Sequence, residues 1–120
     1  MPSKLDIKEH ESGDVTVLKM SGQLVLDDGD LSFRRKIHEL VDRGRLKIVL
    51  DLADVTYIDS AGVGMVVAKL KTLRERGGDV KLLNLNVRGL RIFGITKLLL
   101  VFDTFETEDM AVKSFELEAR

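Results

Sequence analysis

The sequence predicts an α/β domain in which helices pack on a mixed β-sheet, with elements in the order ββαβαβαβα. Near the N-terminus, two segments alternate apolar with polar residues, which is typical of half-buried strands. Further along, segments with helical spacing of apolar residues alternate with short apolar runs rich in β-branched residues. This alternation predicts parallel strands joined by crossover helices that cover the sheet.

A β-hairpin is predicted at the start of the chain. Leu5–His10 and Val15–Met20 alternate apolar with polar residues, and Ser12-Gly13-Asp14 supplies turn residues between them. From Asp30 the apolar spacing changes to that of a helix, which we expect to end at Gly44. The apolar side chains that share one face of this helix are Phe33, Ile37, Leu40 and Val41.

A central strand and a second helix are predicted in the middle of the chain. Leu46–Leu52 is an almost continuous apolar run, the pattern of a strand that is covered on both faces. The helix extends from Ser60 to Arg76, and Gly77-Gly78 ends it. Val80–Leu83 is predicted as the next strand.

The last third of the chain gives weaker patterns. Val87–Gly94 is predicted as a short helix of low amphipathicity, and Leu98–Phe102 either continues this helix or forms the last strand. Thr107 is the predicted N-cap of a final helix. Glu108 and Asp109 follow it in the first turn, where the helix dipole favours negative charge.

Length and charge limit the classes of function. The 120 residues fit one domain, 1–120, and the 19 basic and 20 acidic side chains give a net charge of −1. This balance argues against a surface for nucleic acid or anionic membranes. The chain has no Cys, which excludes disulfides, thiolate metal sites and a Cys nucleophile. The N-terminus has no apolar stretch, so we expect a cytoplasmic protein without direct membrane insertion.

The segment between the central strand and the second helix is the most informative. Asp59 or Ser60 suits the N-cap position of that helix. Gly62 and Gly64 follow, although each Gly costs roughly 1 kcal/mol relative to Ala in a helix interior. Either the glycines leave this turn and the Ser60 hydroxyl accessible to a partner or kinase, or Ser60 simply caps a helix that packs tightly on the sheet. The spacing leaves both interpretations open.

The same segment resembles the signature of a known family. Asp59-Ser60-Ala61-Gly62-Val63-Gly64, after the strand Leu50-Asp51-Leu52, is similar to the signature of STAS domains, the anti-sigma factor antagonist family. Val15–Gly22 resembles the family's early strand, and Asp103–Ala111 resembles its closing segment. The resemblance spans nearly the whole chain. It implies a STAS-type single domain in which Ser60 is the phosphorylation site.

The resemblance also implies a regulatory cycle. The unmodified protein would bind an anti-sigma factor that is also a serine kinase, and would thereby release a sigma factor. Phosphorylation of Ser60 would break this complex, and a serine phosphatase would restore it. The chain itself would be a bacterial phosphoprotein and not an enzyme. It would bind no metal, and it would need no cofactor because the kinase binds the ATP. We expect a monomer or weak dimer.

The predicted partner-binding surface combines the turn, a loop and one helix face. Gly22–Asp28 replaces the family's shorter Gly-x-Leu-Asp turn, whose carboxylate joins the partner-facing surface. The resemblance gives this role to Asp27 or Asp28, and at least one of the two is expected to be a solvated loop acid instead. Ala61 stands where many family members have a second Ser or Thr. Met65 either borders an exposed patch near Ser60 or packs at the edge of the core. The predicted partner-binding residues are Asp27, Asp28, Asp59, Ser60, Ala61, Gly62, Met65 and Lys69.

The sequence gives less support to a nucleotide site, a metal site or a catalytic site. Val67 stands where a dinucleotide fingerprint needs Gly or Ala, and His10 and His38 lack metal-ligand spacing. A serine hydrolase would need a base for Ser60 that the sequence does not supply. Asp51 lacks the acidic pair of an aspartyl phosphoacceptor. The alternative function is a STAS scaffold subunit of a stressosome-like or transporter-associated complex.

Overall fold

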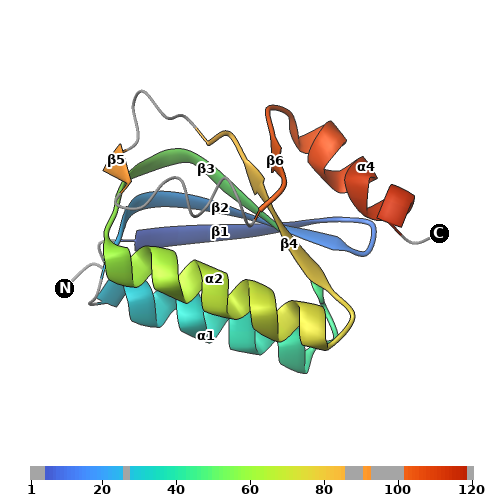
Figure 1. The fold of residues 1–120 in the computed structure, drawn as a ribbon, viewed down its shortest axis with the longest axis horizontal. Coiled ribbons are helices and arrows are strands. Elements are labelled where there is room, and N and C mark those ends of the chain that lie inside the picture. The colour runs from blue at the N-terminus through green and yellow to red at the C-terminus, as the bar shows by residue number, and fades with distance from the viewer. Residues whose placement is uncertain (1–4, 26–27, 86–90, 93–101, 119–120) are drawn as a thin grey trace.

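Among the residues that the structure describes, a mixed β-sheet has two helices on one face and one helix on the other (Figure 1). The computed structural model describes residues 5–25, 28–85, 91–92 and 102–118. The strands are β1 (Leu5–Ser12), β2 (Val15–Leu24), β3 (Lys47–Ile58), β4 (Asp79–Leu83), β5 (Arg91–Ile92) and β6 (Thr104–Phe105). The helices are α1 (Asp28–Asp42), α2 (Ser60–Glu75) and α4 (Glu108–Glu118).

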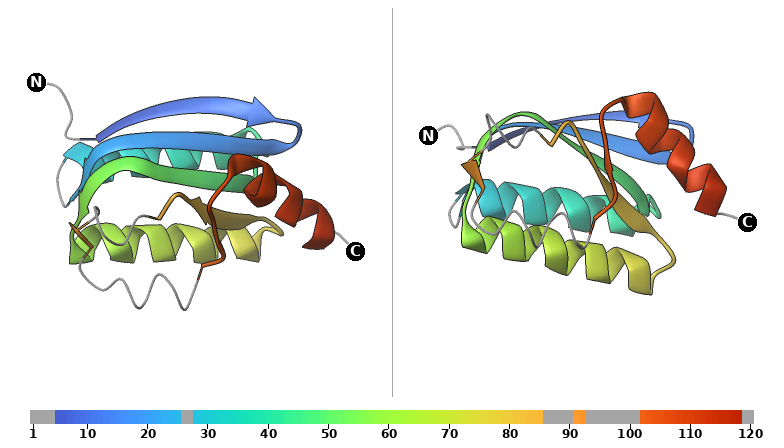
Figure 2. Two further views of the ribbon diagram at one scale, coloured as in Figure 1. Left: turned by 90° about the horizontal axis from the view of Figure 1, so that it is seen from above. Right: turned by 45° about the horizontal axis from the view of Figure 1, so that its top comes forward.

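The strand order confirms the predicted mixed sheet. The strands lie in the order β1-β2-β3-β4-β6, and β5 pairs with β3 off this path. β1 and β2 form the predicted antiparallel hairpin, and every other pairing in this order is parallel. The central position of β3 explains its apolar sequence, since helices cover both of its faces (Figure 2).

The central strand is longer than its apolar run predicts. The run ends at Leu52, but β3 continues to Ile58 with two register shifts against β2. The first shift leaves Ala53 and Asp54 exposed, whereas Leu52 and Val55 on either side of them are buried in one core cluster. The irregularities bend β3. They carry its end toward the start of α2 (Figure 1).

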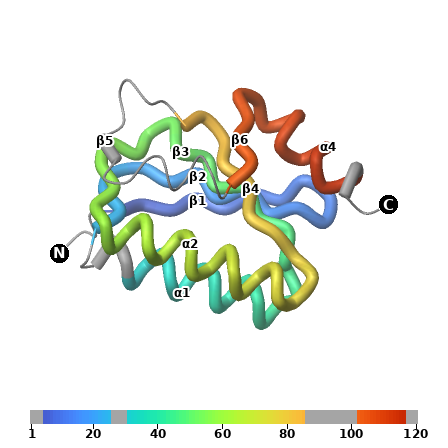
Figure 3. Tube along the Cα trace, viewed as in Figure 1, coloured from blue at the N-terminus to red at the C-terminus, as the bar shows by residue number. Residues whose placement is uncertain are grey.

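Within the described part of the chain, two apolar clusters hold the three layers together. The main cluster lies between the sheet and the helix pair, and Phe33, Ile37, Leu50, Ile58 and Leu70 are among its buried members. The smaller cluster lies between the sheet and α4. It consists of the buried side chains Val15, Val17, Val49, Leu83, Ala111 and Phe115. α1 and α2 run side by side in the same direction and begin at the end of the sheet where β3 ends (Figure 3).

The predicted helix ends agree with the structure. Gly44 and Gly77 follow α1 and α2 with φ values of 73° and 87°, which favour Gly. At α4 the Thr107 hydroxyl accepts a hydrogen bond from the Met110 amide at 3.3 Å, which confirms Thr107 as the N-cap.

Two predictions in the last third are wrong where the structure describes them. Arg91 and Ile92 form β5 beside Tyr57 and Ile58 and are not helical; the rest of Val87–Gly94 lies outside the described residues. The last strand is β6, not Leu98–Phe102, of which residues 98–101 also lie outside the described residues. β6 is set by tertiary pairing, because the Leu82 amide donates to Asp103 O at 3.0 Å and the Asn84 amide to Phe105 O at 2.9 Å.

A buried lysine joins α4 to the sheet. Lys81 on β4 is 1% exposed, and its Nζ lies 2.8 Å from Asp103 Oδ2 and 3.4 Å from Asp79 Oδ2. The ammonium also lies 5.3 Å from the centre of the Phe115 ring on α4. A buried charge is tolerated only when it is paired, so these contacts make Lys81 compatible with the interior.

Charged side chains connect the edge strand β1 to α1. The Glu9 carboxylate accepts hydrogen bonds from Lys36 Nζ and from an Arg43 guanidinium nitrogen, each at 3.2 Å. Glu39 on α1 bonds both cations as well. Partial burial raises the pKa of Glu9, but the bonds to the two cations outweigh it and hold the pKa below its ordinary value of 4.5.

Glu9→Gln is therefore expected to lower the free energy of unfolding by about 0.5–1 kcal/mol at neutral pH. Because the pKa of Glu9 is lower in the folded state, its stabilisation is fully present above pH 4.5 and is lost as the pH falls through the lowered value. Urea unfolding at several pH values tests this. Asp6→Asn, an exposed change on the same strand, is the control, and a difference that persists in strong acid would contradict the prediction.

Candidate functional site

The accessible serine lies where the central strand passes into the second helix. β3 ends at Ile58, Asp59 precedes the helix, and Ser60 is the first residue of α2. Ser60 is exposed, and none of the described residues hydrogen-bonds to its hydroxyl. A modifying enzyme can therefore reach this oxygen without unfolding the domain.

Asp59 is the N-cap of α2. Its Oδ1 accepts a hydrogen bond from the Gly62 amide at 2.7 Å, and its backbone carbonyl accepts from the Val63 amide at 2.9 Å. Asp59 has an extended backbone, with φ −87° and ψ 179°, as expected for a cap. Of the two residues predicted for this position, the structure thus selects Asp59. The Ser60 hydroxyl is not needed to begin the helix.

Gly62 holds the turn against the neighbouring strand. A Cβ at this buried position would clash with the Leu24 carbonyl oxygen and would lie 2.9 Å from Ile58 Cγ2. The same Leu24 carbonyl accepts a hydrogen bond from the Asp59 amide at 3.3 Å. Only Gly allows this close approach. Gly62 is therefore explained by packing, and its predicted contact with a partner stays a prediction.

Gly64 has no comparable explanation. It is exposed, and a Cβ there would meet no atom within 4 Å outside the neighbouring backbone of its own helix. A Gly in an exposed helix interior costs about 1 kcal/mol relative to Ala. The packing of the described residues therefore gives no reason for a Gly in place of an Ala at position 64.

The predicted residues on α2 lie on different sides of the helix. At about 100° per residue, Met65 is about 140° from Ser60 and Lys69 about 180° from it. Met65 is half-buried and packs against the main core cluster, which supports the core-edge interpretation. Lys69 faces α1, with its Nζ 3.0 Å from His38 Nε2. A shared patch of Ser60, Met65 and Lys69 is thus not formed, while Ala61 is half-buried beside Ser60.

The structure instead aligns other residues with the serine. Gly64, Val67 and Lys71 follow Ser60 at intervals of four, three and four residues, so they lie on one side of α2. We call Ser60, Gly64, Val67 and Lys71 the Ser60 stripe. Gly64 and Lys71 are exposed and Val67 is half-buried. The helical spacing was visible in the sequence, but it could not show which side of α2 faces α1.

The acidic residues near the turn have separate positions. Asp27 lies outside the described residues, and Asp28 is described only as the first residue of α1. Asp54 is exposed on β3, with Oδ2 3.8 Å from Lys19 Nζ. The Asp51 carboxylate accepts bonds from the Ala53 amide at 3.1 Å and from Asn84 Nδ2 at 3.0 Å. These bonds give Asp51 a structural role at the bulge of β3.

Neither a metal centre nor a membrane-spanning helix occurs in the described part of the chain. No three of its His, Asp and Glu side chains are placed to hold a metal ion together. None of its helices combines the length and the apolar character that crossing a bilayer requires.

Comparison of the sequence with models of known protein families identifies the family of this chain. The model of the family described as STAS domain matches residues 6–111 of the chain. The chain belongs to the STAS domain family. The Ser60 turn of this STAS domain therefore lies within the matched region.

Several relatives and solved structures are similar to this STAS domain over most of their length. The chain is 33% identical over 103 residues to an anti-sigma-B factor antagonist of Bacillus subtilis, which covers 86% of the chain and 91% of the relative. It is 32% identical over 102 residues to an anti-sigma-B factor antagonist of Listeria monocytogenes, covering 82% and 84%. The crystal structure of an anti-sigma factor antagonist from Mycobacterium paratuberculosis has a TM-score of 0.73 at 19% identity, covering 95% and 96%, and confirms the fold.

The assignment of the N-cap in this STAS domain predicts unequal effects of two neighbouring substitutions. Asp59→Ala removes the bond to the Gly62 amide and is expected to cost about 1 kcal/mol of unfolding free energy. Ser60→Ala removes no hydrogen bond to a described residue and is expected to change the unfolding free energy by less than about 0.5 kcal/mol. Thermal and urea unfolding measure both. Equal losses would mean that the serine shares the capping role.

Gly62→Ala is expected to destabilise the STAS domain by about 1–3 kcal/mol, because the added methyl group overlaps the Leu24 carbonyl. Differential scanning calorimetry measures the change. Gly64→Ala in the same helix is the control, since an added Cβ there would meet no atom within 4 Å outside the neighbouring backbone of its own helix. A Gly62→Ala protein as stable as the wild type would disprove the close packing of the turn.

Proposed function

We propose that this STAS domain is an anti-sigma factor antagonist controlled by phosphorylation of Ser60. The unphosphorylated form binds an anti-sigma factor with serine kinase activity and thereby releases a sigma factor for transcription. Phosphorylation ends the binding, and a serine phosphatase restores it. The chain acts in the cytoplasm as a monomer or weak dimer, and it binds rather than catalyses.

The exposed Ser60 hydroxyl is the observation that carries this proposal. A kinase needs an accessible oxygen on a local structure that tolerates a new charge. Ser60 meets both needs, because it is exposed at the first position of α2 and Asp59 already caps the helix. Two of the relatives above 30% identity, both named as anti-sigma-B factor antagonists, support the choice of partner.

The proposed modification is a phosphoryl transfer from the partner's ATP. The Ser60 oxygen attacks the γ-phosphorus, its proton passes to a base of the kinase, and ADP leaves with the oxygen of the broken phosphoanhydride bond. The phosphatase hydrolyses the phosphoserine ester. Water supplies the new oxygen of inorganic phosphate, and the Ser60 oxygen regains a proton. This chain supplies only the acceptor oxygen and its placement.

The added charge acts on the interface more than on the fold. A phosphoserine adds about −1.5 to −2 charge at neutral pH. At the N-terminus of α2 the helix dipole stabilises such a charge by about 0.3–1 kcal/mol, so the domain remains folded. A docked partner, by contrast, would bury the phosphate beside the half-buried carboxylate of Asp59. Desolvation and like-charge repulsion then oppose binding.

Incubation with ATP and each purified anti-sigma kinase of the source organism tests the proposal. Wild type is expected to gain one phosphoryl group by intact mass and to lose its kinase in a pull-down. Ser60→Ala is expected to stay unmodified and bound, and Ser60→Asp to bind at least about tenfold more weakly.

Ser114→Ala is the matched control, because Ser114 lies on α4 and is half-buried. It is expected to behave as wild type. Modification of the Ser60→Ala protein would show that the acceptor is another residue. Assembly of wild type into large particles on size-exclusion chromatography, without kinase binding, would instead favour the scaffold function.

A further inference from the structure

We infer that α4 opens from the sheet as one unit while the rest of the described fold stays in place, and that the buried Lys81 makes this opening easier. Opening uncovers the apolar sheet side chains beneath α4, which are Val15, Val17, Val49 and Leu83. α4 covers the face of the sheet opposite to α1 and α2 (Figure 1). This conformational change is separate from the proposed function, and its test needs no anti-sigma partner.

α4 has a small apolar interface. Among the residues that the structure describes, it buries only Ala111 and Phe115, with Val112 half-buried beside them. None of its described residues belongs to the main cluster, whereas α2 buries five residues. An isolated helix of 11 residues is only marginally stable in water, so α4 depends on this interface. Elements with few buried apolar contacts open at a lower free energy than the whole domain does.

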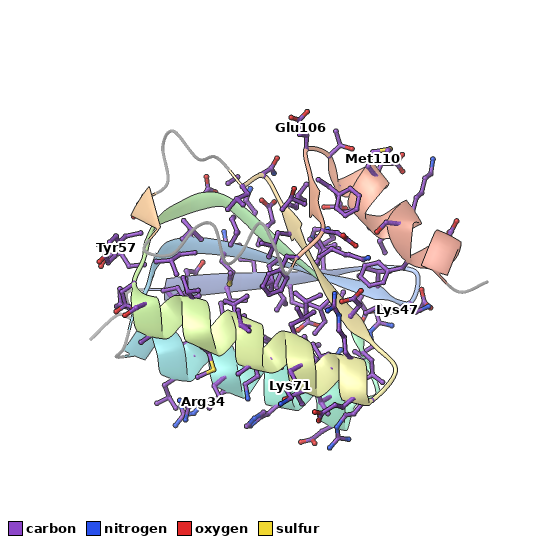
Figure 4. The ribbon with its side chains drawn as sticks, viewed as in Figure 1. Arg34, Lys47, Tyr57, Lys71, Glu106 and Met110 are labelled. Carbon is purple, nitrogen blue, oxygen red and sulfur yellow. The ribbon has the colours of Figure 1, made fainter. Side chains whose placement is uncertain are left out.

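The chain before α4 allows the helix to move separately from the sheet. Phe102 is buried in the main cluster, and the Asp103 and Phe105 carbonyls hold β6 on β4 by accepting two amide hydrogen bonds. Glu106 and Thr107 follow and are exposed. Figure 4 shows Glu106 in this connection, directed away from the sheet. Rotation about the backbone of these two exposed residues is sufficient to release α4 while β6 stays paired.

A hollow beside α4 shows that its docking leaves space on one side. The hollow has a volume of about 430 Å³ and lies between α4 and the turn that joins β1 to β2. Val112 and Phe115 line it from α4, and Gly13 and Val15 line it from the hairpin. A closely packed interface leaves no such space. The α4 side chains of the smaller cluster therefore border an open hollow.

Lys81 makes the opening of α4 easier because its charge is buried in the closed state. Lys81 lies two residues before Leu83 on β4, so both side chains are on the face that α4 covers. The ammonium group is 1% exposed and lies 5.3 Å from the centre of the Phe115 ring. Burying a charge costs free energy that a carboxylate partner returns only in part.

The ion pairs of Lys81 do not need α4. Asp103, whose Oδ2 lies 2.8 Å from Lys81 Nζ, precedes β6 and is 61% exposed. Asp79, whose Oδ2 lies at 3.4 Å, begins β4 itself. Both carboxylates therefore stay beside the ammonium group when α4 opens, while water reaches it again. This hydration offsets part of the apolar contact that opening breaks.

Amide hydrogen exchange of the unmodified wild-type chain, followed by NMR at several urea concentrations, tests the inference. Amides in the middle of α4, such as those of Val112 and Phe115, are expected to be at least about 100-fold less protected than the amide of Leu70 in α2. Their protection is also expected to depend less on urea, because opening α4 exposes less surface than global unfolding does.

Two substitutions are expected to move the opening in opposite directions. Lys81→Met removes the buried charge and should raise the protection of α4 about tenfold. Neither carboxylate is then left buried and unpaired, because Asp103 is exposed and Asp79 keeps Arg74 Nε at 3.1 Å. Asp103→Asn takes the carboxylate at 2.8 Å away from the ammonium group and should lower the protection about tenfold. Lys113→Met, the same substitution at an α4 lysine that is 64% exposed, is the control and should change it within about twofold.

Equal protection and equal urea dependence of α4 and α2 would overturn the inference, because α4 would then open only when the whole domain unfolds. Protection that falls gradually toward Glu118 would also overturn it, because such a gradient indicates fraying of the helix end. Protection of α4 in the Lys81→Met protein that is equal to or lower than in wild type would overturn the role of Lys81.

Discussion

The close approach of Gly62 to the Leu24 carbonyl is the contact on which the site depends. It places the first turn of α2 directly on the end of β2, and the hydrogen bond from the Asp59 amide to the same carbonyl fixes the turn from its other side. The bulges of β3 lead the chain to this point. Because Asp59 takes the capping role, Ser60 is not needed as a cap, and it stays exposed with no hydrogen bond from its hydroxyl to a described residue. Backbone packing therefore sets where the turn lies, and the Ser60 side chain remains exposed.

This arrangement separates the energetics of folding from those of binding. The residues that stabilise the turn, Gly62 and Asp59, contact the domain itself, whereas Ser60 and Gly64 contribute little to its packing. Modification at such a position can alter an interface without unfolding the protein. The α4 side of the sheet is held independently by Lys81 and the smaller apolar cluster. A modification at the Ser60 turn can therefore act on a partner without any change in the packing of the core.

Local patterns predicted the elements that local interactions determine. The hairpin, the helices α1, α2 and α4, and the caps at Gly44, Gly77 and Thr107 follow from periodicity and turn residues. The extension of β3 and the strands β5 and β6 depend on pairing with distant segments, so the sequence did not predict them. The family resemblance directed attention to Ser60, but neither it nor the spacing could reveal that Lys69 contacts His38 on α1. The side of α2 available to a partner is therefore a property of the assembled fold.

The central claim is that one phosphate at Ser60 removes binding while the domain stays folded. Its most direct test compares fully phosphorylated and unmodified wild-type protein in two measurements on the same samples, thermal unfolding and kinase affinity by titration calorimetry. The account predicts melting temperatures within about 2 °C of each other and an affinity at least about 100-fold weaker after phosphorylation. Equal affinities, or a phosphorylated protein that loses binding because it unfolds, would contradict it.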